Sequence, residues 1–541
     1  MSWYNEAIFY HIYPLGLTGA PKQNEYTEPV HRLNTLLPWI DHIKEIGCTA
    51  LYIGPLFESV GHGYETTDYK KLDSRLGTNE DLTAFVKACH DKKIKVIFDG
   101  VFNHTGRDVN FWGNNEYNDG FSYDNWGGYN LLVKLNQRNP EVQDYICDVI
   151  RYWVSEFDVD GIRLDAADVL DFDFMRALRR TAEEVKPDFW LMGEVIHGDY
   201  SRWVNGETLH SVTNYALHKA LYSGHNDHNY FEIAHTVKYL QNMGNLDLYN
   251  FVDNHDVERI YTKLSNKAHF TPVHILLYTL PGVPSIYYGS EFGIEGRKER
   301  SSDDSLRPAL NLEDYESALS DNPCTALITA LGKIRQHTPA LSYGSYTELQ
   351  LTNRQYAFAR DLDNMRVIIT VNNDDNDAWM NLPAGNAIEY IGTLTGQKVS
   401  VEGGHINVRI GANSGEIWIP SEETSVPETF SENKDSIVEE TPVTQEEVKN
   451  EGSAETKTAS ASSVPEAAST KGDTDRTPAS AEKEPVNFDP NKAPEDMSTE
   501  ELQAGILAKM ANNGPVTDQM KKTVYDNIWH DSLVNWLKSF C

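Results

Sequence analysis

Four short segments decide the fold of this chain: VIFD at 96–99, GIRLD at 161–165, WLMGE at 190–194 and YNFVDNHD at 249–256. Each is an apolar run that ends in an acidic residue, and a segment with helical spacing follows each of the first three. Apolar runs of this length that alternate with amphipathic helices are typical of buried parallel strands in βα units. Carboxylates just past the C-terminal ends of such strands lie where barrel and doubly wound enzymes place their chemistry. The pattern therefore predicts an α/β enzyme with acidic residues at one edge of its sheet.

The strand–helix alternation extends over residues 1–340, which we interpret as one catalytic domain. Eight repeats suit a TIM (β/α)8 barrel at the upper end of its usual size range. A doubly wound open sheet is the alternative, but no glycine-rich turn follows the first predicted strand. The predicted strands are 7–13, 49–53, 94–98, 161–164, 189–193, 209–213, 247–252 and 283–288. Apolar residues at helical spacing predict a helix over about residues 30–46, between the first two strands.

Two regions depart from this alternation. Residues 105–138, after the third strand, are rich in aromatic residues, Gly and Asn, and a long irregular connection inside a compact domain is usually functional. We expect a small excursion beside the active site. Over residues 341–420 the hydrophobic period changes to two, as in 367–371 and 406–410, and Asn, Asp and Gly turns separate the runs. This pattern predicts a C-terminal antiparallel β-sandwich domain.

The remaining residues divide into a linker and a tail. Residues 421–497 are rich in Glu, Ser, Thr, Pro and Ala, and such a segment cannot bury enough apolar surface to offset its chain entropy. We therefore predict a disordered acidic linker. Residues 498–541 are expected to form a helical tail that starts with a capping-box pattern, STEE at 498–501. The tail either docks on its own protein or is a tethered module that binds a protein partner.

Composition bounds the environment and the partners. The chain has 541 residues, a mass of 61.2 kDa and a formal net charge of −34, which argues against nucleic acid and anionic membranes as partners. Its five cysteines are scattered, as expected for reduced thiols in a reducing compartment. The N-terminus lacks the pattern of an export signal, and no window has the roughly 18 apolar residues that span a bilayer. We expect a cytoplasmic enzyme.

The acidic residues at the strand ends point to one chemistry. A single Asp after a strand is usually a helix cap, but two carboxylates and an arginine on neighbouring strands, with a third carboxylate across the barrel, crowd charge into one site. Retaining glycoside hydrolysis needs one ionised carboxylate and one carboxylic acid about 5–5.5 Å apart. Arg163 lies two residues before Asp165 on the same strand and is expected to keep Asp165 ionised. Glu194 is expected to have less positive charge beside it than Asp165 has. The neighbouring Asp165 carboxylate should therefore raise the pKa of Glu194, which suits an acid–base catalyst.

One histidine follows the first segment, and another lies within the fourth. His104 and His255 are placed to donate hydrogen bonds to sugar hydroxyls. For either histidine alone, a satisfied structural hydrogen bond is the simpler interpretation. The sequence leaves both open.

The four segments resemble the ordered conserved regions of the α-amylase family of glycoside hydrolases, family 13. The resemblance covers about residues 4–420 and includes HGY at 62–64, PGVP at 281–284 and IYYG at 286–289. It implies a TIM barrel followed by a β-sandwich, and an enzyme that cleaves α-glucosidic bonds.

The resemblance also implies roles for individual residues. Asp165 would be the nucleophile, Glu194 the general acid/base, and Asp256 the carboxylate that binds the sugar hydroxyls and stabilises the transition state. Tyr64 would stack under the sugar, and Arg307 would pair with the transition-state aspartate. The remaining residues that would line this subsite are Asp99, His104, Arg163 and His255.

Three departures within the family bear on the substrate. KLN at 134–136 is similar to the neopullulanase and cyclomaltodextrinase subgroup, whose additional N-terminal dimerisation domain we expect to be absent because the first strand starts within ten residues. Val169 replaces the histidine that polymer-acting α-amylases carry four residues after the nucleophile, which favours short maltodextrins over granular starch. No cofactor is implied as required. Asn103 matches a ligand of α-amylases that bind calcium, but no clear acidic cluster completes a metal site.

These observations lead to three hypotheses. The leading one is a hydrolase that cleaves α-1,4 glucosidic bonds in maltooligosaccharides through a covalent glycosyl-Asp intermediate, with α-1,6 branches and cyclic dextrins as further candidate substrates. A 4-α-glucanotransferase uses the same intermediate with a sugar hydroxyl in place of water, and the sequence does not separate the two. A non-catalytic barrel that serves as an assembly subunit is disfavoured, because all three carboxylates are present and no membrane helix is predicted.

Overall fold

The computed structural model describes residues 2–107, 122–300 and 302–421, and near the C-terminus residues 492–493, 497–512, 521, 524 and 537. The chain divides into two compact units, Met1–Asn433 and Lys434–Cys541. Almost all of the predicted disordered linker, 421–497, and much of the predicted helical tail lie outside the described residues.

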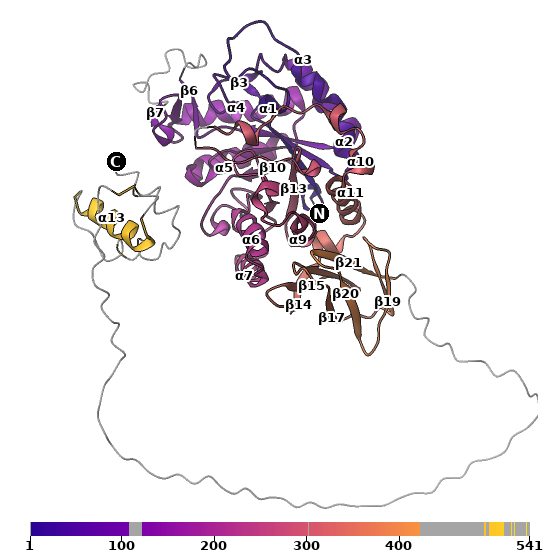
Figure 1. Ribbon diagram of the computed structural model, residues 1–541. Helices are drawn as coiled ribbons and strands as arrows, with labels where there is room; N and C mark the ends of the chain where they lie inside the picture. The colour runs from indigo at the N-terminus through magenta and orange to yellow at the C-terminus, as the bar shows by residue number, and fades with distance from the viewer. Residues whose placement is uncertain are drawn as a thin grey trace, which may run out of the picture. The chain divides into compact units, whose positions relative to one another are not determined.

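Eight parallel strands form the core of the first unit (Figure 1). Hydrogen-bonded neighbours follow the order β11-β10-β9-β5-β2-β1-β13-β12, and a bridge between Thr213 and Tyr249 joins the two ends into a closed barrel. The eight predicted strands are all present, which confirms the TIM barrel. They are β1 (Phe9–Ile12), β2 (Ala50–Ile53), β5 (Lys95–Gly100), β9 (Gly161–Leu164), β10 (Trp190–Gly193), β11 (Ser211–Val212), β12 (Tyr249–Phe251) and β13 (Val283–Tyr287).

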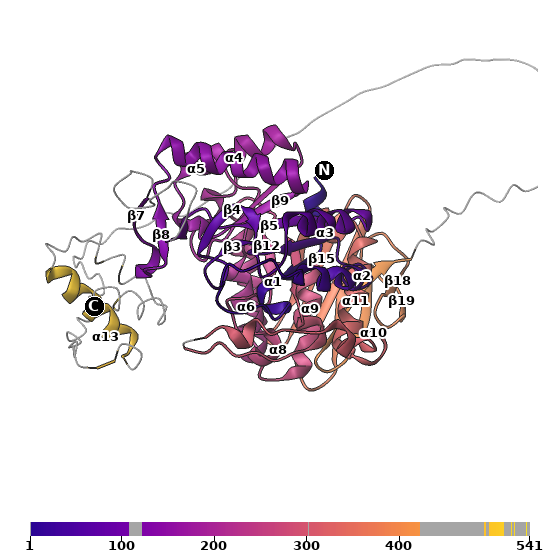
Figure 2. The same cartoon turned by 90° about the horizontal axis from the view of Figure 1, so that it is seen from above.

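Amphipathic helices surround these strands, as the view from above shows (Figure 2). The predicted helix 30–46 begins later than expected: a 3-10 turn at Arg32–Leu36 comes first, because Pro38 is tolerated only in the first turn of the α-helix that follows. The helices are α1 (Pro14–Leu17), α2 (Leu37–Glu45), α3 (Asn79–Asp91), α4 (Pro140–Phe157), α5 (Phe172–Val185), α6 (Tyr215–Asn226), α7 (Tyr230–Gln241), α8 (Ile260–Lys263), α9 (Phe270–Thr279), α10 (Ala318–Asp321), α11 (Pro323–Gln336) and α12 (Ala340–Tyr343).

Strand register brings the acidic residues together at one end of the barrel. Asp99 on β5 is paired with Arg163 on β9. The next residues continue the ladder, since the Asp165 amide donates to the Gly100 carbonyl (3.1 Å) and the Glu194 amide donates to the Leu164 carbonyl (2.9 Å). Three neighbouring strands therefore end in polar residues at the same level.

Two small sheets lie outside the barrel. The excursion after β5 contains an antiparallel sheet in the order β6-β8-β7, formed by His104–Gly106, Leu132–Leu135 and Ser122–Asn125. A hairpin of β3 (Phe57–Ser59) and β4 (Thr66–Leu72), which was not predicted, follows β2. Its strands mix charged and apolar residues without a clean period of two, and the loop between them carries Tyr64.

The C-terminal strands form two facing sheets, which confirms the antiparallel sandwich. One has the order β14-β15-β16-β21-β18-β19, the other pairs β17 with β20, and apolar side chains such as Ile368, Met380 and Val408 fill the space between them. Helix α9 packs against β16 and β21. The strands are β14 (Ser345–Leu351), β15 (Gln355–Leu362), β16 (Met365–Asn372), β17 (Ala378–Pro383), β18 (Glu389–Gly392), β19 (Lys398–Ser400), β20 (His405–Ile410) and β21 (Ser414–Pro420). The domain limits at 340 and 420 stay predictions.

The second unit contains helix α13 (Thr499–Asn512). Its predicted capping box is confirmed, because the Glu501 amide donates to Ser498 Oγ (3.2 Å) and the Ser498 amide donates to Glu501 Oε2 (2.6 Å). One face of the helix is buried within this unit, in a cluster of Met497, Leu502, Ile506, Val524 and Leu537.

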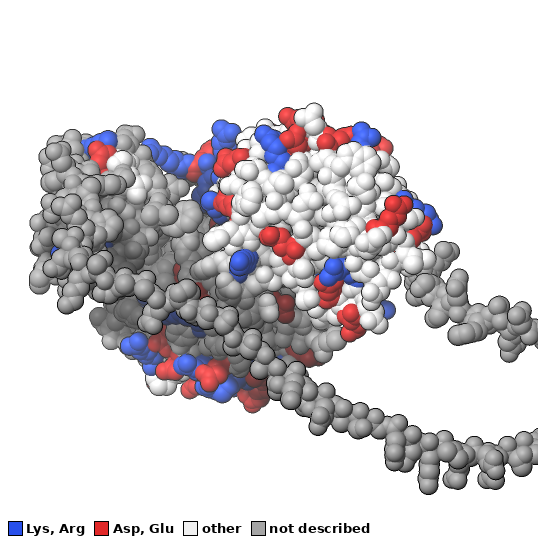
Figure 3. Space-filling view, turned by 90° about the horizontal axis from the view of Figure 1, so that it is seen from below, with Lys and Arg blue, Asp and Glu red and all other residues white. Residues whose placement is uncertain are grey.

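Charges of both signs occur on the face shown in Figure 3, where acidic and basic side chains surround a broad uncharged area. No continuous basic surface is present on the described part of that face. No described helix combines the length and the apolar character that crossing a bilayer requires. Of the five cysteines, the four described ones, Cys48, Cys89, Cys147 and Cys324, are free thiols.

A buried carboxylate at the start of β9 makes a stability prediction possible. Asp160 accepts a hydrogen bond from the Val96 amide (3.0 Å), and it lies 2.7 Å from His90 Nε2 and 2.8 Å from Lys95 Nζ. Burial by itself raises the pKa of Asp160, but these partners outweigh burial and hold the pKa far below its ordinary range. A carboxyl with a lowered folded pKa stabilises the fold above its unfolded pKa of about 3.9 and loses that contribution as the pH falls.

We expect Asp160→Asn to lower the free energy of unfolding at pH 7 by about 3 kcal/mol, because the surrounding cations lose their partner. Urea unfolding at pH 7 and pH 3 measures this difference, which should shrink at the lower pH. Asp148→Asn, which removes an exposed partner of Lys70, is the matched control and should cost at most about 1 kcal/mol. Equal unfolding midpoints for Asp160→Asn and the wild type at pH 7 would contradict the prediction.

Candidate active site

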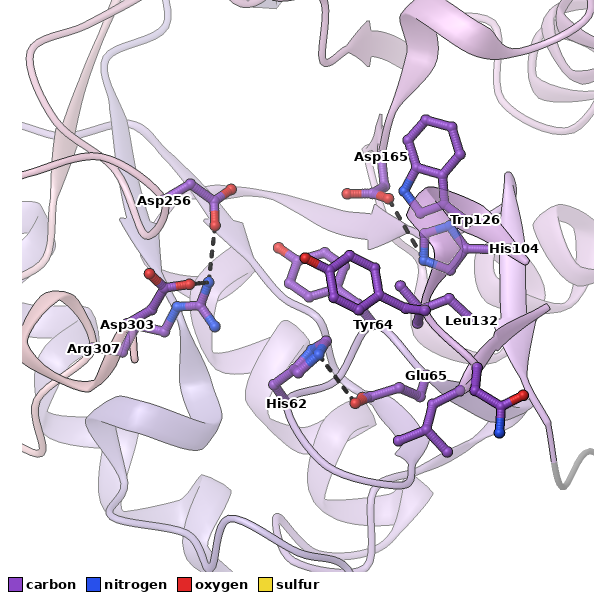
Figure 4. A pocket seen from close by; sticks show the side chains of 13 residues that line it. His62, Tyr64, Glu65, His104, Trp126, Leu132, Asp165, Asp256, Asp303 and Arg307 are labelled. Atoms are coloured by element: carbon purple, nitrogen blue, oxygen red, sulfur yellow. Dashed lines mark hydrogen bonds and ion pairs between the residues drawn. The ribbon is translucent and has the colours of Figure 1, made fainter. Parts of the chain in front are cut away.

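A cavity of about 540 Å³ opens at the end of the barrel where the acidic residues meet (Figure 4). It is lined by residues of the β3–β4 loop, the excursion, the segments that follow β9 and β12, and the loop after β13. Its lining includes five of the nine predicted site residues, namely Tyr64, His104, Asp165, Asp256 and Arg307.

Arg163 is the centre of the charge network. Its side chain is 3% exposed, and Nη1 donates to Asp99 Oδ1 (3.0 Å) and to Asp165 Oδ1 (2.8 Å). Nη2 lies 2.9 Å from Glu194 Oε2. The predicted contact between Arg163 and Asp165 is confirmed, whereas the premise that Glu194 is less compensated is wrong, because both carboxylates contact the same guanidinium.

Burial and the Arg163 charge act in opposite directions on the pKa of Asp165. Burial raises the pKa of Asp165 well above the ordinary value, and the nearby Glu194, Asp99 and Asp256 carboxylates act in the same direction. The Arg163 guanidinium opposes this shift without cancelling it. The expectation that Arg163 keeps this carboxyl ionised stays a prediction: the 2.8 Å contact favours the ionised form, and the loss of solvation opposes it.

Asp256 lies across the cavity from Asp165, and a basic side chain contacts each of its two carboxylate oxygens. Oδ1 accepts a hydrogen bond from Arg307 Nη2 (2.8 Å), which confirms the predicted pair, and Oδ2 lies 3.0 Å from His255 Nε2. Burial by itself raises the pKa of Asp256, but His255 and Arg307 outweigh it and hold the pKa well below the ordinary range. Asp256 is therefore a fixed anion on the wall opposite Asp165 (Figure 4).

Tyr64 joins the two sides of the network. Its hydroxyl donates to Asp99 Oδ2 (3.2 Å) and contacts His255 Nε2. The Tyr64 and His255 rings are stacked, with their centroids 5.7 Å apart and their planes inclined by 9°. Because Tyr64 also lines the cavity, its ring is held rigidly at the wall, as a platform for a sugar requires.

His104 keeps one nitrogen available at the cavity. Burial lowers its pKa to about 4, so its imidazole is neutral at pH 7. Nε2 has no hydrogen-bond partner among the described residues and lies 4.0 Å from Asp165 Oδ2. The Trp126 ring stacks on the imidazole at a centroid distance of 6.2 Å. His104 can therefore exchange a hydrogen bond with a ligand beside Asp165.

Eight of the nine predicted site residues belong to one connected network, and His104 lies beside it, 4.0 Å from Asp165. Arg163 joins Asp99, Asp165 and Glu194, and Tyr64 links Asp99 to His255, Asp256 and Arg307. Their individual catalytic roles stay predictions. Further residues that line the cavity were not predicted as site residues, and these are His62, Glu65, Trp126, Tyr129, Asn130, Leu131, Leu132 and Asp303. The aromatic composition of the excursion was a signal for Trp126 and Tyr129, and Asp303 stands one helical turn before Arg307.

Asn103 is the residue that matches a calcium ligand of α-amylases. The Asn103 amide oxygen accepts a hydrogen bond from Gln137 Nε2 (3.2 Å). No group of three or more His, Cys, Asp or Glu residues is placed to hold a metal ion in the part of the chain that the structure describes. The calcium interpretation of Asn103 stays untested, because calcium also binds amide and backbone oxygens and because residues 108–121 of the excursion lie outside the described residues.

Comparisons with known proteins agree with this geometry. The family model described as "Alpha amylase, catalytic domain" matches residues 32–129 and 126–326. A cyclomaltodextrinase of Thermoanaerobacter pseudethanolicus is 30% identical over 414 residues, which are 69% of this chain and 71% of that protein. An intracellular maltogenic amylase of Bacillus subtilis is 30% identical over 292 residues, 49% of this chain and 50% of that protein.

A solved structure supports the same fold. The crystal structure of an Anoxybacillus α-amylase superposes with a TM-score of 0.70 at 24% identity and covers 79% of this chain and 100% of that chain. At this identity the superposition establishes the architecture only. The family model, however, matches more than half of the chain, and so the chain belongs to the α-amylase family of glycoside hydrolases.

Proposed function

We propose that this enzyme hydrolyses α-1,4 glucosidic bonds in maltooligosaccharides with retention of the anomeric configuration. The observation that carries the proposal is the arrangement of three carboxylates at one end of the barrel: Asp165 and Asp256 line the cavity, and Glu194 shares the Arg163 guanidinium with Asp165. Two carboxyl groups on adjacent strand ends can act as nucleophile and acid on the same glycosidic bond.

The reaction follows from these positions. Asp165 attacks the anomeric carbon while Glu194 donates a proton to the departing glycosidic oxygen, which gives a glycosyl ester and a shortened sugar. Glu194 then removes a proton from water, the water oxygen bonds to the anomeric carbon, and Asp165 leaves as a carboxylate. Asp256 stabilises the positive charge that develops on the sugar ring in both steps.

The substrate proposal rests on the relatives and on the site. Two of the relatives are named for cyclomaltodextrins and for maltose release, and Tyr64 offers an aromatic platform for a glucose ring. We therefore include cyclic dextrins, and α-1,6 branches, as further candidate substrates. An intracellular enzyme among the relatives supports a cytoplasmic location. The helical tail as a binding module for a protein partner also remains a proposal.

Product analysis tests the function. The enzyme is incubated separately with maltotriose, pullulan and β-cyclodextrin, products are separated by chromatography, and the anomer released first is read by NMR. We expect glucose and maltose from maltotriose, with the α-anomer formed first. Longer oligomers as the main early products would show that the enzyme is a glucanotransferase rather than a hydrolase. The absence of product from all three substrates would refute the proposal.

A further inference from the structure

The arginine that contacts Asp256 lies on a segment without regular structure. Arg307 directly follows a 3-10 turn at Asp304–Leu306 and precedes Pro308. Its Nη2 donates to Asp256 Oδ1 (2.8 Å), and its Nε donates to the His255 carbonyl (3.0 Å). Since neither an α-helix nor a strand fixes this backbone, other contacts must hold Arg307 in place.

Three buried side chains supply those contacts from the barrel. The Tyr287 hydroxyl and Arg259 Nη2 both donate to the Leu306 carbonyl, each at 3.0 Å. The Tyr288 hydroxyl donates to the Pro308 carbonyl (2.9 Å). The carbonyls on both sides of Arg307 are thus bound to the end of β13 and to the residue before α8.

Arg259 is fully buried although its side chain carries a positive charge. It is 0% exposed, and its guanidinium lies over the Tyr287 and Tyr288 rings, at 4.4 and 5.1 Å from their centroids. Its Nη1 donates to the Tyr288 carbonyl (2.6 Å) and to Ser290 Oγ (3.2 Å). Carbonyl dipoles and ring faces therefore solvate this cation and lock it against both tyrosines.

We propose that Arg259, Tyr287 and Tyr288 form a clamp that positions Arg307 against Asp256, and that the clamp sets the rate of the glycosidic step rather than the affinity for substrate. The inference rests on the proposed function, because it assigns Asp256 to the transition state. An anion that stabilises developing positive charge acts only when it is oriented in advance. A displacement of about 1 Å in such a group can cost up to about 100-fold in rate.

Two hydroxyl deletions test the clamp. We expect Tyr287→Phe and Tyr288→Phe each to lower kcat on maltotriose about tenfold, within the range that a small misplacement produces, while KM changes less than about twofold. Tyr230→Phe is the matched control: Tyr230 is equally buried, and its hydroxyl contacts His225, away from the cavity. The control should keep the wild-type kcat. Circular dichroism and thermal unfolding show whether each variant is folded at the assay temperature.

A double-mutant cycle separates positioning from general loss of packing. If the clamp acts through Arg307, Tyr287→Phe lowers kcat in the wild-type background but adds little to Arg307→Ala. Equal effects in both backgrounds, or a wild-type kcat in both tyrosine variants, would overturn the clamp. Failure of the proposed function is recognised separately, because the wild-type enzyme would then release no product, and the cycle would be repeated on an α-glucoside that it does cleave.

Discussion

Asp165→Asn is expected to lower kcat on maltotriose by about 10⁴- to 10⁶-fold, the range typical of removing a catalytic nucleophile. Asparagine has the shape of aspartate and can still accept a hydrogen bond from Arg163, but its amide does not attack the anomeric carbon. The fold should be little affected, because Arg163 retains Asp99 and Glu194 as partners. Initial rates over a range of maltotriose concentrations measure the effect.

A control and a trapping experiment make this result specific. Asp173→Asn makes the same chemical change on the exposed first turn of α5 and should leave kcat within about twofold, as expected for a surface substitution. A fluorinated glucosyl fluoride that forms a slow-reacting ester should add its glycosyl mass to the peptide that contains Asp165. Substantial kcat in Asp165→Asn, or the label on another carboxylate, would remove Asp165 from its proposed role.

Glu194→Gln is expected to reduce kcat on maltotriose by about 10²- to 10⁴-fold, the usual contribution of general acid catalysis. The glutamine cannot donate a proton to the departing oxygen. A substrate whose leaving group needs no proton tests whether proton donation is the function that Glu194→Gln loses. With α-maltosyl fluoride, the rate at which the glycosyl-enzyme forms should fall far less than with maltotriose, because fluoride departs without protonation.

Pre-steady-state kinetics distinguish the two steps for this variant. Glu194 also activates water in the second step, so the glycosyl-enzyme should accumulate and fluoride should be released in a burst. An equal loss of rate for maltotriose and for the fluoride would show that Glu194 is not the proton donor.

The charged residues of the site show which contacts the sequence can predict and which it cannot. The spacing of Arg163 and Asp165 on one strand was sufficient to predict their contact, since residues two apart on a strand point to the same side. The ion pair between Arg163 and Glu194 was not predictable, because it depends on how far the guanidinium extends toward the next strand. The raised pKa of Asp165 also depends on burial by elements distant in the sequence.

The small elements outside the barrel show a similar limit. Pro38 marked the start of α2, but the sequence-based helix ignored it and began about seven residues early. The β3–β4 hairpin was missed because its side chains do not alternate. Trp126 belongs to a region whose composition predicted a functional role. Its stacking on His104 depends on the pairing of β6 with β8, which brings residues that are distant in the sequence together.

The sequence by itself determined the barrel, the sandwich and the set of carboxylates at the strand ends, because periodicity and apolar runs are local properties that dictate which faces are buried. Tertiary structure alone decided which groups share the Arg163 charge, how much water each carboxyl loses and how the clamp of Arg259, Tyr287 and Tyr288 holds Arg307. These properties arise from distances of about 3 Å between side chains that are far apart in the chain, and no local pattern encodes such distances.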